Sequence, residues 1–115
     1  MLNIDKRRTA NNVKALFKKY DDLVRLSKRE QRLNHSTDAT KQLQTIAETI
    51  NDIDIDAYRF IIENRFIKHY SVKDVVSHVG LSKPRFNDYQ NDALVAFAEL
   101  YYLDNLVVLG GGNNG

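Results

Sequence analysis

The sequence has no cysteine, one proline and five glycines among its 115 residues. Without cysteine the chain cannot form disulfides, thiolate zinc sites or iron–sulfur clusters, and it has no cysteine nucleophile. Long apolar runs are missing too, because the longest, Ala93 to Ala98, is far shorter than the roughly 20 residues of a membrane span. The N-terminal residues include no apolar core of a signal peptide. We therefore expect a single-domain protein of the cytoplasm that makes no membrane contact, too short for a barrel or doubly wound enzyme.

Charge is unevenly distributed along the chain, although the net charge is only +2. Residues 1–34 hold ten basic and four acidic side chains, whereas residues 35–63 hold two basic and six acidic ones. A smaller basic excess, five against three, returns over residues 64–92. Clustered basic charge attracts polyanions such as nucleic acids, but a solvated helix face has the same composition. Both interpretations stay open on charge alone.

Apolar residues recur at helical spacing through nearly the whole sequence. One amphipathic stripe runs from Val13 to Val24, with Thr9 as the expected N-cap. A break is expected at Asn34–Thr37, and a second helix over Leu43–Ile50. A third helix should begin at Asp56 as its cap and continue to Phe66. No segment keeps the two-residue alternation of a half-buried strand for long, so the pattern predicts an all-α protein.

We expect three regions along the chain. Residues 1–55 form a basic N-terminal helical region, residues 56–103 a helix-turn-helix region that packs with it, and residues 104–115 a C-terminal tail. The glycine-rich end of the tail, Gly110–Gly115, has the composition of a flexible linker.

Residues 71–90, SVKDVVSHVGLSKPRFNDYQ, are the most informative stretch. The stretch predicts a short helix over Val72–Val79 capped by Ser71, then a turn at Gly80, then a long helix capped by Ser82. Glycine suits that turn because a left-handed backbone disfavours a Cβ atom. This is the pattern of a helix-turn-helix, although an ordinary helical hairpin with a polar surface has the same pattern.

The side chains of this stretch divide into a packing set and an outward set. The packing set comprises Val75, Val76, Val79, Leu81, Phe86 and Tyr89. The outward set comprises Ser82, Lys83, Arg85, Asn87, Asp88, Asn91 and, in part, Gln90. Polar side chains at the front of the second helix are those that meet base edges in the major groove. Ser71 and Lys73, at the start of the first helix, are expected to contact phosphate, because a helix N-terminus presents free N–H groups to an anion. The predicted DNA-binding residues are therefore Ser71, Lys73, Ser82, Lys83, Arg85, Asn87 and Asn91.

Several segments resemble the ArpU family of phage-encoded transcriptional regulators, whose C-terminal part is similar to the DNA-binding region 4 of sigma factors. The segments are NVKALFKKYDDLVRL at 12–26, YRFIIENRFI at 58–67, DVVSHVGLSKPRFND at 74–88, ALVAFAELY at 93–101 and LVVL at 106–109. The resemblance implies control of late phage genes for packaging, lysis or export, through a DNA-reading surface without catalytic residues. The link at Asn34–Asp38 departs from the family, where a longer variable stretch is expected.

Patterns for catalysis or metal binding are incomplete in this sequence. Asp52, Asp54, Asp56 and Glu63 fall at the ligand positions of an EF-hand loop, but Ala57 stands where that loop requires glycine. The three histidines are far apart in sequence, without a second ligand at helical spacing. No phosphate-binding loop, dinucleotide fingerprint or nucleophile elbow occurs. We therefore expect no enzymatic activity, no metal and no cofactor.

The function predicted from these residues is a sequence-specific, double-stranded DNA-binding transcriptional regulator of a phage or prophage. Two alternatives stay open: a module that binds host RNA polymerase, with the basic N-terminal helix as its interaction arm, and a structural packaging protein that finds its site with a helix-turn-helix. A homodimer is expected because inverted half-sites match a two-fold protein. The stripe from Val13 to Ser27 spans only about two heptads, so it should pack on the Leu43–Ile50 helix rather than form a coiled coil.

Overall fold

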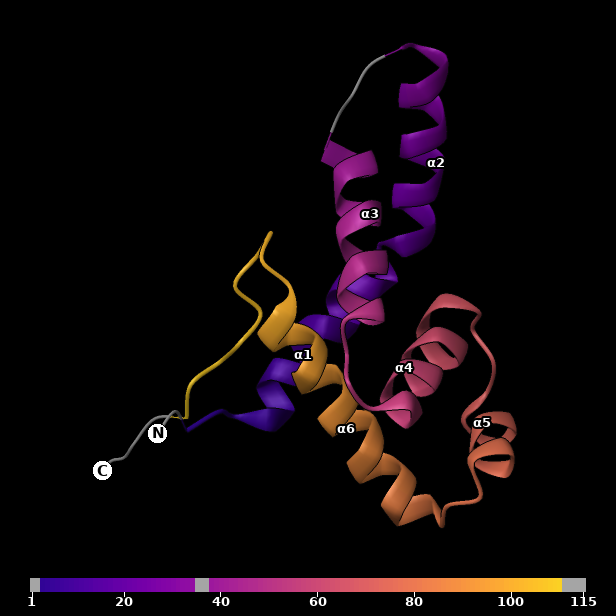
Figure 1. Cartoon of the computed structure of the whole chain (residues 1–115), viewed down its shortest axis with the longest axis vertical. Coiled ribbons are helices and arrows are strands. Elements are labelled where there is room, and N and C mark those ends of the chain that lie inside the picture. Colours follow the sequence, from indigo (N-terminus) through magenta and orange to yellow (C-terminus); the bar gives the residue numbers. More distant parts are fainter. Residues whose placement is uncertain (1–2, 35–37, 111–115) are drawn as a thin grey trace.

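The computed structural model describes residues 3–34 and 38–110, and over these residues the chain is almost entirely helical (Figure 1). The elements are α1 (Lys6–Lys18), α2 (Tyr20–Arg32), α3 (Asp38–Asn51), α4 (Asp56–Ile62), the π-helical turn η1 (Glu63–Ile67), α5 (Val72–Val79) and α6 (Lys83–Leu100). Within the described ranges β-pairing is limited to one antiparallel bridge between Ile4 and Leu109. The prediction of an all-α fold is confirmed.

The first predicted helix is in fact two helices, which meet at Lys19. This division lets α1 pack along α6 while α2 packs against α3 (Figure 1). The prediction that Thr9 caps the helix is wrong, because α1 begins a turn earlier, where the Asp5 carboxylate accepts the Arg8 backbone N–H at 3.0 Å. Thr9 is instead buried, and its hydroxyl accepts the Val108 N–H at 2.9 Å. The hydroxyl therefore fastens the C-terminal segment to α1.

The predicted break follows the end of α2 at Arg32, and Asn34 has a left-handed φ of 59°. Residues 35–37 of that break lie outside the described residues, as do residues 111–115 of the predicted linker. Asp56 is the first residue of α4 rather than its cap, since Ile55 occupies the cap position. The Asp56 carboxylate pairs with the Arg59 guanidinium one turn later. The helix predicted from Asp56 to Phe66 continues beyond α4 as η1.

The main core is built around α6, which packs against α1 on one side and α4 on the other. Phe97 of α6 is fully buried and meets Phe17 of α1 edge to face, with ring centroids 4.9 Å apart. Phe17 also stacks on Phe66 of η1 at 5.5 Å. Helices from the two ends of the chain thus share one apolar core.

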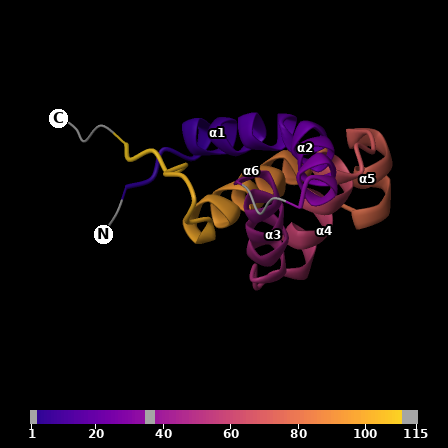
Figure 2. The same cartoon turned by 90° about the horizontal axis from the view of Figure 1, so that it is seen from above.

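Two parts of the molecule extend from this core in different directions. The α2–α3 hairpin forms one end of the longest axis (Figure 1). Seen from above, α5 lies at the opposite end of the molecule from the segments that carry Ile4 and Leu109 (Figure 2). The helix-turn-helix and the paired terminal segments are therefore well separated.

Candidate nucleic-acid interface

The local geometry of the predicted helix-turn-helix is present. The Ser71 hydroxyl accepts the Asp74 N–H at 3.1 Å at the start of α5, and the Ser82 hydroxyl accepts the Arg85 N–H at 3.3 Å at the start of α6. Gly80 ends α5 with φ of 70°, in the left-handed region where a Cβ is disfavoured. Both caps and the turn are confirmed as predicted.

A separate apolar cluster holds α5 and α6 against α4. Ile61, Val75 and Phe86 are at most 2% exposed, and each comes from a different one of these helices. Partly buried side chains surround them: Phe60, Val72, Val76, Val79, Leu81 and Tyr89. Phe86 is buried as predicted, whereas Leu81 in the turn is only half-buried. Because three helices contribute to the cluster, the orientation of α6 depends on α4 as well as on α5.

Arg65 of η1 adds a polar connection that the sequence did not suggest as functional. Its Nε donates to Gln90 Oε1 of α6 at 3.3 Å, and its Nη1 donates to the Tyr70 carbonyl at 2.9 Å. The prediction that Gln90 faces partly outward is wrong, because this contact turns it inward and leaves it 8% exposed. The sequence contained a signal for this contact, since Arg65 shares the helical spacing of the apolar residues Tyr58, Ile61, Ile62 and Phe66. Such a residue usually needs a hydrogen-bond partner inside the protein.

The predicted base-reading residues lie at the front of α6. Lys83, Arg85 and Asn87 are exposed, while Asn91, one turn further, is half-buried and less accessible than predicted. Asn87 and Asn91 share one side of the helix by their four-residue spacing. The Arg85 guanidinium lies 5.8 Å from the centre of the Tyr89 ring, on another side. The exposed front of α6 thus combines the Asn87 amide, the Arg85 guanidinium and the Lys83 ammonium group with the carboxylate of Asp88.

Aromatic packing supports the position of Arg85. The Tyr89 ring beneath it meets Tyr58 of α4 edge to face, with centroids 5.8 Å apart. Burial raises the pKa of the Tyr58 hydroxyl, and the nearby Asp92 carboxylate raises it further, so Tyr58 stays neutral at physiological pH. Asp92 itself pairs with Lys6 of α1 at 3.2 Å. Arg85 itself is exposed above these rings.

The residues predicted to contact phosphate, Ser71 and Lys73, lie at the start of α5. Lys73 on α5 is exposed, and no carboxylate lies within ion-pair distance of Lys73, Lys83 or Arg85 in the described part of the chain. The hydroxyls of Ser71 and Ser82 already accept backbone N–H groups, but each keeps one O–H to donate. All seven predicted residues therefore belong to α5, α6 or their caps.

The residues weighed for metal binding do not form a cluster. Asp52, Asp54 and Asp56 are exposed, and in the described ranges no three His, Asp or Glu side chains are placed to hold a metal ion.

None of the described helices combines the length and the apolar composition that crossing a bilayer requires. The prediction that the apolar stripe from Val13 to Ser27 packs on the Leu43–Ile50 helix is right only for its α2 part, which α3 covers. The α1 part is covered by α6 instead, because the chain divides into two helices at Lys19.

No family model, curated protein or solved structure matches this chain. The resemblance to the ArpU family therefore stays a prediction, carried by the segments quoted for it. The geometry of α5 and α6 stands on its own as the basis for a functional proposal.

Proposed function

We propose that this chain is a sequence-specific, double-stranded DNA-binding transcriptional regulator that places the front of α6 in the major groove. The observation that carries the proposal is the buried cluster that joins the front of α6 to α4 and α5, together with the polar, exposed side chains at that front. A base-reading helix needs both properties, because its side chains must reach base edges from a fixed backbone.

Each exposed residue has a role that follows from its chemistry. The Asn87 amide can accept from and donate to one adenine, and the Arg85 guanidinium can donate twice to one guanine. Lys73 and Lys83 contact phosphates near the helix N-termini, assisted by the Ser71 and Ser82 hydroxyls. Asn91 is half-buried and so reads only a base that approaches its side of the helix. The mechanism involves no catalytic step, metal or cofactor.

The biological setting is part of the proposal and rests on the resemblance to the ArpU family. It assigns the protein to the cytoplasm of a bacterial host and its targets to promoters of late phage genes. A homodimer on an inverted repeat suits this function, because two copies related by a two-fold axis read two equal half-sites.

The proposal is tested by selecting a binding site from random duplexes and comparing Asn87→Ala with wild type on that site and on a scrambled duplex. Loss of the amide should lower affinity for the selected site about 5- to 150-fold, equivalent to about 1–3 kcal/mol, and leave the scrambled duplex nearly unchanged. Asn11→Ala, at an exposed asparagine of α1, is the matched control and should change neither affinity.

Two results would contradict this proposal. Failure to enrich any site would remove sequence-specific reading altogether. If a site is enriched but Asn87→Ala keeps the full ratio of specific to nonspecific affinity, α6 does not read the bases there. Binding of purified host RNA polymerase without DNA would then favour the polymerase-binding alternative.

A further inference from the structure

A second basic surface lies on α2, away from the helix-turn-helix. Its members occupy successive turns of one helical face, at spacings of three, four and seven residues: Arg25, Lys28, Arg29 and Arg32. We refer to these four residues as the α2 basic stripe. All four are exposed, and they lie opposite Leu23 and Ser27, which face α3 and are buried.

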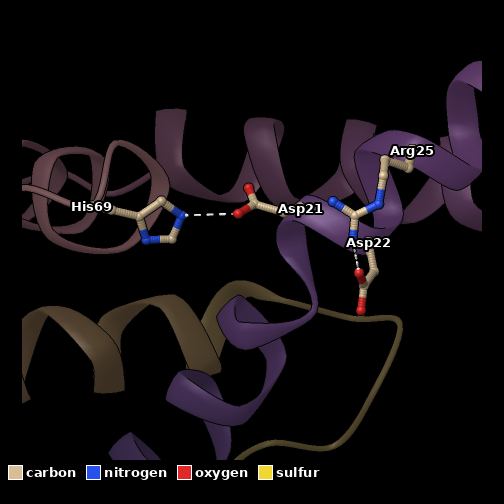
Figure 3. Close-up of polar contacts among 4 residues, drawn as sticks. All are labelled: Asp21, Asp22, Arg25 and His69. Carbon is tan, nitrogen blue, oxygen red and sulfur yellow. Dashed lines mark hydrogen bonds and ion pairs between the residues drawn. The ribbon is translucent and has the colours of Figure 1, made fainter.

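The acidic residues of α2 do not neutralise most of this stripe. Asp21 points away from it, toward His69, with its Oδ2 3.4 Å from the His69 Nε2, and Asp22 pairs with Arg25 (Figure 3). The Glu30 carboxylate turns toward α3, where it accepts the Thr40 hydroxyl at 3.2 Å. In the part of the chain that the structure describes, Lys28, Arg29 and Arg32 thus have no carboxylate within ion-pair distance.

The side chains of the stripe surround an open hollow of about 610 Å³, lined by Arg25, Lys28, Arg29, Gln31 and Arg32. Guanidinium groups present several N–H donors in a fixed plane, which matches the oxygens of a phosphate. Cations in the last turn of a helix also stabilise its dipole, but that effect falls off within one turn. It therefore accounts for Arg29 and Arg32 and not for the start of the stripe.

The placement of α2 favours a duplex as the partner. In both views α2 lies on the side of the hairpin nearer to α5 (Figures 1 and 2). The hairpin and the front of α6 lie toward opposite ends of the longest axis, whose extent is 49 Å. That length corresponds to about 14 base pairs at 3.4 Å each. A duplex seated on α5 and α6 can therefore pass the α2 basic stripe further along.

We propose that the α2 basic stripe binds the phosphate backbone of the same duplex that α6 reads, outside the bases that α6 contacts. This inference rests on the proposed function. Phosphate contacts at this distance carry no sequence information but add affinity on any DNA that is long enough. The stripe therefore makes affinity depend on duplex length without changing base preference.

The test combines a triple variant with two lengths of duplex in salt titrations. Lys28→Gln/Arg29→Gln/Arg32→Gln removes the three unpaired charges and keeps the Arg25–Asp22 pair. One duplex holds only the selected site, about one helical turn, and the other extends it by about 15 base pairs on each side. A second triple variant, Arg7→Gln/Arg8→Gln/Lys41→Gln, removes the same net charge from exposed positions of α1 and α3. Circular dichroism checks that both variants fold.

The stripe variant should lose at least about tenfold in affinity for the long duplex at 0.1 M salt, and its salt slope should fall by about 2.7. Its affinity for the short duplex and its base preference should match those of the control variant. Equal affinities of the two variants for the long duplex would overturn this proposal alone, since the wild type would still read its site. If the stripe variant lost the same affinity for the short duplex as for the long one, the α2 basic stripe would not bind outside the bases that α6 contacts.

Two further outcomes separate this proposal from its alternatives. If poly-glutamate binds the wild type more tightly than the long duplex does, and the stripe variant loses that binding, the stripe serves an acidic protein instead. A wild type that binds neither duplex overturns the proposed function together with this inference.

Discussion

Replacing Phe86 with alanine should remove the centre of the cluster that joins α4, α5 and α6. The Phe86 side chain is 0% exposed and shares the cluster with only two other fully buried side chains, Ile61 and Val75. Losing the transfer free energy of the ring, and leaving a cavity between three helices, should together cost about 3–5 kcal/mol of unfolding free energy.

Thermal unfolding followed by circular dichroism measures this cost. At about 4 °C per kcal/mol for a domain of this size, Tm should fall by about 12–20 °C. Tyr102→Ala is the control, since that ring is 69% exposed and its loss should change stability by no more than about 0.5 kcal/mol. A Phe86→Ala protein that melts within a degree or two of wild type would show that the register of α6 against α4 and α5 is wrong.

Two further substitutions test the turn and the polar connection behind it. Gly80→Ala should lower the free energy of unfolding by about 1–2 kcal/mol, because the φ of 70° at this position disfavours a Cβ atom. The cost is one of backbone conformation alone, since no atom lies within 4 Å of an added Cβ. Urea unfolding measures this cost, and Gly80→Asn should lower the stability less. Arg65→Met should cost about 1–3 kcal/mol, because Gln90 and the Tyr70 carbonyl each lose a charged donor. In urea unfolding, Arg65→Met and Gln90→Met should show strongly non-additive costs, and additive costs would mean that the two side chains do not interact.

The features predicted correctly from the sequence are those with local causes. Ser71 and Ser82 cap their helices because a hydroxyl three residues before a free N–H can reach it whatever the rest of the chain does. Gly80 ends α5 because the turn itself needs a left-handed residue. The bounds of α5 were predictable for the same reason, since both of its ends carry their own signals.

The features missed depend on contacts between distant parts of the chain. The division at Lys19 follows from α1 packing on α6 and α2 on α3, and no breaking residue marks it. Thr9 looks like a cap in sequence, but its hydroxyl bonds Val108, 99 residues away. Helical position alone places Gln90 partly outside, whereas Arg65 from another element holds it inside.

The candidate interface shows the same division between local and distant causes. Helical spacing correctly places Lys83, Arg85 and Asn87 on the outside of α6, because the buried Phe86 and Phe97 define the inner side. Spacing cannot give the exposure of Asn91, which depends on how closely neighbouring helices approach. The most exposed candidates for base contacts are therefore those nearest the N-terminus of α6.

The two parts of α6 would link the proposed DNA reading to the whole fold. Its front carries the candidate base contacts, while its later turns are buried against α1 and α4, with Ala93, Leu94 and Phe97 fully inaccessible. A helix held along most of its length cannot rock independently at its exposed end, so the angle at which Asn87 would meet a base is set by the core. The N-terminal helix α1 is part of that core through Phe17. The helix-turn-helix is thus not a separable unit, because the packing of α1 on α6 helps to aim it.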